Sequence, residues 1–108
     1  MAAAQSTRID ISHVVKLGDD NYKQWRLQIT VVFKAAGIWD VPSGITERTE
    51  SNADDFDRKD IRAQAYIIPT LNAVNANHIY HCKSSKEILN KLKQIHSDAS
   101  TLNKQHTL

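Results

Sequence analysis

The stretch from residue 21 to residue 36 reads NYKQWRLQITVVFKAA. Its large apolar side chains recur at intervals of three and four residues, which places them on one side of an α-helix: Tyr22, Trp25, Ile29, Val32, Phe33 and Ala36. The residues before it, Gly18 to Asn21, favour a turn that leads into a helix. Gly37 follows where helices commonly end in a left-handed residue. The pattern predicts an amphipathic helix at the centre of a helical core.

The same helix carries a second apolar row on the side opposite Trp25, formed at four-residue spacing by Leu27, Val31 and Ala35. A helix that is apolar on two sides is expected to be covered on two sides. Two interpretations follow. Either the row is interior because this is the central helix of the bundle, or part of it is left for a neighbouring subunit as a self-assembly interface.

A second helix is expected after the loop that follows Trp39, with Ser51 or Asn52 as its cap. Acidic residues in its first turns suit the positive end of the helix dipole. Pro69 lacks an amide hydrogen and clashes with the preceding turn, so it should end or kink this helix. The apolar positions of the helix share one face, and they are Phe56, Ala63, Ile67 and Leu71.

Two more helices follow in the pattern, the first a short one over residues 71–80. Ser84 and, three residues later, Glu87 form a capping box that opens the next helix. Its apolar side chains are Ile88, Leu89, Leu92 and Ile95. Residues 97–100 interrupt the pattern, and residues 101–108 resemble the first turns of a fifth helix that is cut short.

Together these patterns predict an all-α fold, a compact bundle of four to five helices over residues 16–108 behind a flexible arm of residues 1–15. A chain of 108 residues has room for one domain and one core. Within the arm, the alternation of Ile9 and Ile11 is compatible with an extended stretch that is held in place by these two side chains. The expected core consists of Tyr22, Trp25, Ile29, Phe33, Trp39, Phe56, Ala63, Ile67, Leu71, Ile88, Leu92 and Ile95.

The composition, 41% hydrophobic and 24% charged, is that of a soluble globular protein. No apolar run approaches the roughly 20 residues of a membrane span, and the first residues carry no secretory signal pattern. The single cysteine, Cys82, excludes an internal disulfide. We therefore expect a cytoplasmic protein that is stabilised by packing and makes no membrane contact.

Candidate catalytic and metal-binding residues are few. The five histidines are scattered, and no nucleophile elbow, aspartic-protease signature or phosphate-binding loop occurs, so we expect no enzyme and no cofactor. His78, His81 and Cys82 are close enough in sequence to suggest zinc, but a third and fourth ligand at standard spacing are missing. A polar helix end with one half-buried thiol fits better. The acidic segment of residues 47–60 lacks a calcium-loop pattern and is expected to be a solvated helix start.

Lysines near the end of the chain are candidates for weak contact with RNA phosphates: Lys86, Lys91 and Lys93. They do not share one helix face, no aromatic side chains interleave with them, and the net charge is only +2. Direct RNA binding is therefore expected to be weak or absent.

Four blocks of the sequence, taken in order, resemble the Gag proteins of copia-type LTR retrotransposons. Residues 16–25, KLGDDNYKQW, resemble the family's opening turn and first helix, and residues 37–41, GIWDV, with Gly44 resemble the block that follows. The Phe56 helix has the spacing of the family's second helix, with Phe where Trp is usual. Residues 84–96, SSKEILNKLKQIH, resemble its capped helix, with Leu89 at a common aromatic position and His96 in place of Tyr.

This resemblance implies the amino-terminal lobe of a capsid. Such a lobe self-assembles through homo-oligomeric contacts, and with other Gag chains, into cytoplasmic virus-like particles that enclose the element's RNA. Two alternatives stay open. One is a host-adopted Gag remnant that binds a protein partner or inhibits assembly, and the other is a helical nucleic-acid-binding domain, which the modest charge disfavours.

Overall fold

The computed structural model describes the backbone of residues 9–106 and the side chains of residues 9–97. Within that range the chain is all-α and contains no strand, as predicted; a single isolated parallel bridge joins Leu17 and Leu71. The elements in chain order are α2 (Tyr22–Ala35), α3 (Ala53–Ile67), the 3-10 helix η1 (Ile68–Thr70), α4 (Ala73–His78) and α5 (Ser85–His106). None of these helices has the length and apolar character needed to cross a membrane.

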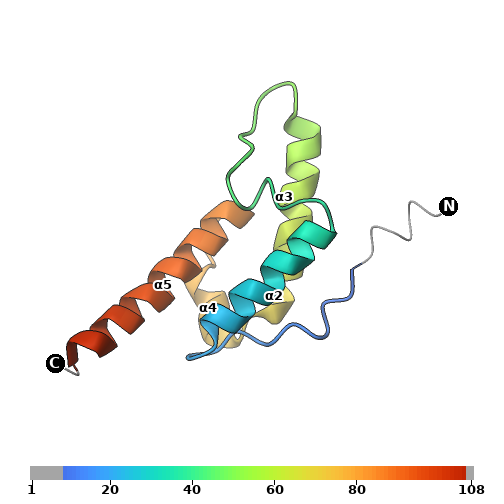
Figure 1. The fold of residues 1–108 in the computed structure, drawn as a ribbon. Helices are drawn as coiled ribbons and strands as arrows, with labels where there is room; N and C mark the ends of the chain where they lie inside the picture. Colours follow the sequence, from blue (N-terminus) through green and yellow to red (C-terminus); the bar gives the residue numbers. More distant parts are fainter. Residues whose placement is uncertain (1–8, 107–108) are drawn as a thin grey trace.

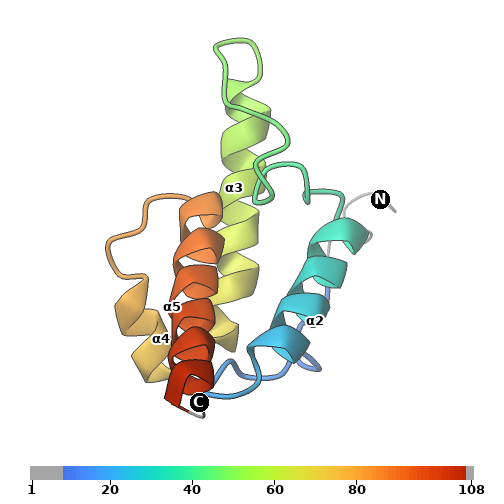
Figure 2. The ribbon, with the colours of Figure 1, turned by 60° about the vertical axis from the view of Figure 1, so that its left-hand side comes forward.

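The helices surround one core. α3 contacts both α2 and α5, while the short α4 packs on α5 (Figures 1 and 2). The side chains that fill the centre without measurable exposure come from α2, α3, α5 and the segment before α2: Leu17, Trp25, Ile29, Phe33, Ala63, Ile67 and Leu92. The segment before α2, helix α2, the second half of α3 and helix α5 therefore meet in a single hydrophobic cluster.

The predicted helix ends are confirmed where a local signal defines them. Gly37 follows α2 with φ +74°, and α3 ends before the turn that contains Pro69. At the start of α5, the Ser84 hydroxyl accepts the Glu87 amide hydrogen at 3.1 Å, while the Glu87 carboxylate accepts the Lys83 amide hydrogen at 2.9 Å. This is the predicted capping box, with the return bond made one residue earlier than in the standard pattern.

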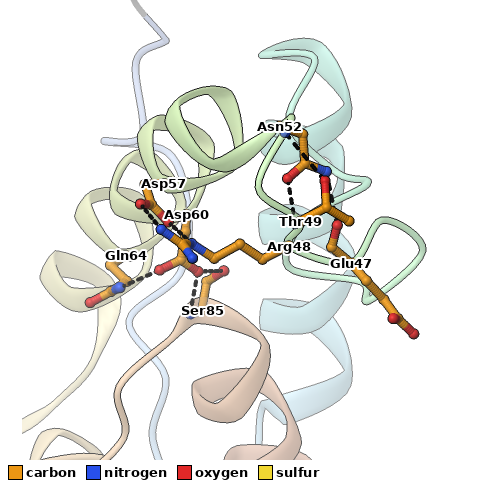
Figure 3. Close-up of polar contacts among 8 residues, drawn as sticks. All are labelled: Glu47, Arg48, Thr49, Asn52, Asp57, Asp60, Gln64 and Ser85. Atoms are coloured by element: carbon orange, nitrogen blue, oxygen red, sulfur yellow. Dashed lines mark hydrogen bonds and ion pairs between the residues drawn. The ribbon is translucent and has the colours of Figure 1, made fainter.

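Asparagine occupies the residue before both α2 and α3, but neither side chain caps its own helix. Asn21 Oδ1 accepts the Gly18 amide hydrogen at 2.9 Å, and Asn52 Oδ1 accepts the Thr49 amide hydrogen at 2.7 Å. Each Nδ2 also donates to the carbonyl five residues back, at 2.9 and 2.8 Å respectively. Both asparagines therefore hold the preceding loop in the shape that leads into the helix (Figure 3, for Asn52).

Two predictions about the chain ends need correction. The expected break at residues 97–100 is absent, because α5 continues through it to His106. Residues 97–100 have modest helix preference but include neither Gly nor Pro, so an established helix continues through them. The prediction of a flexible arm over residues 1–15 is wrong for residues 9–15. Val14 is buried in the core, and the Val15 amide donates to Gln28 Oε1 at 2.7 Å. Residues 1–8 lie outside the described part of the chain.

Most of the expected core is buried, with exceptions at its edge. Tyr22 and Trp39 are half-buried against the cluster, while Phe56 and Ile95 are half-buried and do not belong to it. Phe56 lies in the first turn of α3, which rises beyond the neighbouring helices in Figure 1. The cluster instead includes side chains outside the expected set, among them Leu17, Ile38 and Tyr66.

Candidate interaction surface

The two apolar sides of α2 have different surroundings. Trp25 and Phe33 are buried in the core, but Leu27 is 66% exposed, Val31 is 56% exposed and Ala35 is exposed as well. The interpretation of this row as interior is therefore wrong, because no described part of the chain covers it. We call Leu27, Val31 and Ala35 the α2 row.

Two contacts between α2 and distant parts of the chain fix the direction in which the α2 row faces. The Trp25 indole Nε1 donates to the Thr70 hydroxyl at 2.8 Å, and that hydroxyl donates to the Ile67 carbonyl at 2.6 Å. At the start of the helix, the Tyr22 ring stacks on His96 of α5 with centroids 5.0 Å apart. Rotation of α2 about its axis would break these contacts, so the row is held outward.

The charged residues of α2 itself are all positive, while two exposed acids, Asp19 and Asp20, stand just before the helix. α2 contains no acidic residue, and its exposed lysines, Lys23 and Lys34, make no hydrogen bond or ion pair with any residue the structure describes. Arg26, in contrast to the two lysines, has partners within the chain. It donates to the Tyr22 hydroxyl at 3.3 Å, and its guanidinium lies 5.7 Å from the centroid of the Trp39 ring. The surface is thus an apolar strip with a free cation toward each end.

A second exposed apolar row lies on α3 and its continuation into η1, and sequence reasoning missed it. Ile61 is 66% exposed, Ile68 is 47% exposed and Ala65 between them is exposed. Their spacing of four and then three residues is the same signal that identified the α2 row. We call Ile61, Ala65 and Ile68 the α3 row.

The acidic segment contains one residue that is not solvated, contrary to expectation. Asp60 is only 9% exposed, and its Oδ1 accepts both the amide hydrogen and the hydroxyl hydrogen of Ser85, at 2.8 and 2.7 Å (Figure 3). Its Oδ2 accepts from Gln64 Nε2 at 2.8 Å. Ser85 is the first residue of α5, so the carboxylate lies at the positive end of that helix and ties it to α3. Because Ser85 has no measurable exposure, its hydroxyl is unavailable to a substrate.

A second buried polar group joins α4 to α5. Asn75 Nδ2 donates to the Leu17 carbonyl at 3.2 Å, so its Oδ1 is the atom that faces His96 Nε2, at 3.0 Å. Since Oδ1 can only accept, His96 carries its proton on Nε2. Burial lowers the pKa of His96, and the nearby His78 lowers it further, against a weaker opposing effect of Asp19.

The other candidate residues do not form a site together. Among the residues the structure describes, no three His, Cys, Asp or Glu side chains come together as a metal site would require. Burial raises the pKa of the Cys82 thiol, which keeps it protonated and weakly nucleophilic at neutral pH. Near Cys82, His78 and His81 are exposed.

The three lysines proposed to contact RNA are all exposed on α5. Lys86 lies against the loop after α2, where a Cβ added to Gly44 would come within 2.9 Å of its Cε. The aliphatic chain of Lys86 therefore packs on Gly44, which favours a structural contact for this residue.

No protein-family model, curated protein or solved structure significantly matches this chain. Function is therefore inferred from the exposed surface and from the sequence blocks described above.

Proposed function

We propose that this chain is a self-assembly module of the retrotransposon-capsid type, and that it associates with copies of itself through the α2 row. The observation that carries the proposal is the exposure of Leu27 and Val31 on a helix whose opposite side is locked into the core. Exposed apolar rows with fixed orientation are typical of protein interfaces. The family resemblance adds the kind of partner, another Gag chain, and the enclosed cargo, RNA.

The energetics fit a shell built from weak contacts. Burying two side chains of this size contributes about 2–4 kcal/mol, before the loss of translational and rotational freedom on association is subtracted. One such contact cannot hold a tight dimer, and interfaces below about 1,200 Å² are usually transient. Many equivalent contacts within a closed shell stabilise one another, because dissociation of one subunit must break several.

Val31→Asp tests this proposal against a matched control, Ile45→Asp. Ile45 is 73% exposed in the loop between α2 and α3, so it is comparably exposed but lies outside the α2 row. We expect both variants to keep the wild-type circular-dichroism spectrum and melting temperature to within a few degrees, because both positions are exposed. Sedimentation over a series of concentrations should show weak association in the wild type and in Ile45→Asp, and its loss in Val31→Asp.

Two results would contradict the proposal. A wild-type chain that remains strictly monomeric at the highest accessible concentration would show that the surface does not self-associate. Equal loss of association in both variants would show that added negative charge, and not the α2 row, is responsible.

A further inference from the structure

We draw no further inference here: the strongest candidate, the exposed apolar row on α3 beside the α2 row already described, has exposed charges of both signs near it, and nothing in the structure shows what covers it.

Discussion

Asp60→Ala removes three hydrogen-bond acceptor contacts from a site between α3 and α5 that is nearly closed to water. The partner in α3, Gln64, is half-buried and can turn toward solvent. The two donors of Ser85 cannot, because Ser85 has no measurable exposure. A buried donor left without a partner costs about 1–3 kcal/mol, so we expect a loss of about 2–5 kcal/mol in the free energy of unfolding. Small domains have only about 5–15 kcal/mol in total.

Asp60→Asn separates the hydrogen bonds from the charge. The asparagine Oδ1 can still accept both Ser85 hydrogens, and Gln64 can turn its own oxygen toward the new amide. What is lost is the negative charge at the amino end of α5, so a smaller cost of about 0.5–2 kcal/mol is expected. The alanine variant should therefore be less stable than the asparagine variant, and the asparagine variant less stable than the wild type.

Urea unfolding followed by circular dichroism measures both variants, with Asp54→Ala as the control. Asp54 is an exposed acid in the same helix, and its removal should change stability by less than about 0.5 kcal/mol. Combining Asp60→Ala with Ser85→Ala should cost less than the sum of the two single changes, because the pair interacts directly. If Asp60→Ala were as stable as Asp54→Ala, the bonds of Asp60 would merely offset the cost of burying its charge.

The remaining predictions concern pH, the core and metal. The pKa of His96 in the folded chain lies below its ordinary 6.5, so unfolding takes up a proton, and stability should fall as the pH drops from about 6.5 to the folded pKa. His96→Gln should flatten this slope in a plot of melting temperature against pH. An unchanged slope would assign the pH dependence to other groups. Trp25→Ala should cost about 3–5 kcal/mol, and a wild-type melting temperature would contradict its place in the core. Chelator should leave helicity unchanged, whereas stoichiometric zinc in the purified protein would revive a metal site.

The sequence by itself determined the features that depend on neighbours within about four residues. Gly37 ends α2 because its backbone takes a positive φ, and Pro69 ends α3 because it lacks an amide hydrogen. Ser84 and Glu87 begin α5 through bonds that span three and four residues. The apolar stripe of α2, with Trp25 at its centre, follows from the helical repeat alone. The all-α class follows from these local signals, because together they define every helix except the shortest ones.

The sequence was misleading where a local preference was weak or a distant partner decided the outcome. Residues 97–100 were expected to break a helix, yet α5 passes through them because no strong helix breaker stands there. Asp60 looked like one of several solvated acids, since nothing near it in sequence reveals Ser85, which lies 25 residues away. Leu17 is fully buried although it precedes the first helix, because Thr70 and Asn75 bind its backbone.

The two sides of α2 show most clearly what only the tertiary structure decided. The spacing of Leu27 and Val31 established that α2 is apolar on two sides, and it allowed either an interior or an outward row. The bond from Trp25 to Thr70 and the stacking of Tyr22 on His96 fix the rotation of the helix, and those partners lie 45 and 74 residues further along the chain. Periodicity defines a face relative to the helix axis. Which face meets the core depends on long-range contacts that no local pattern contains.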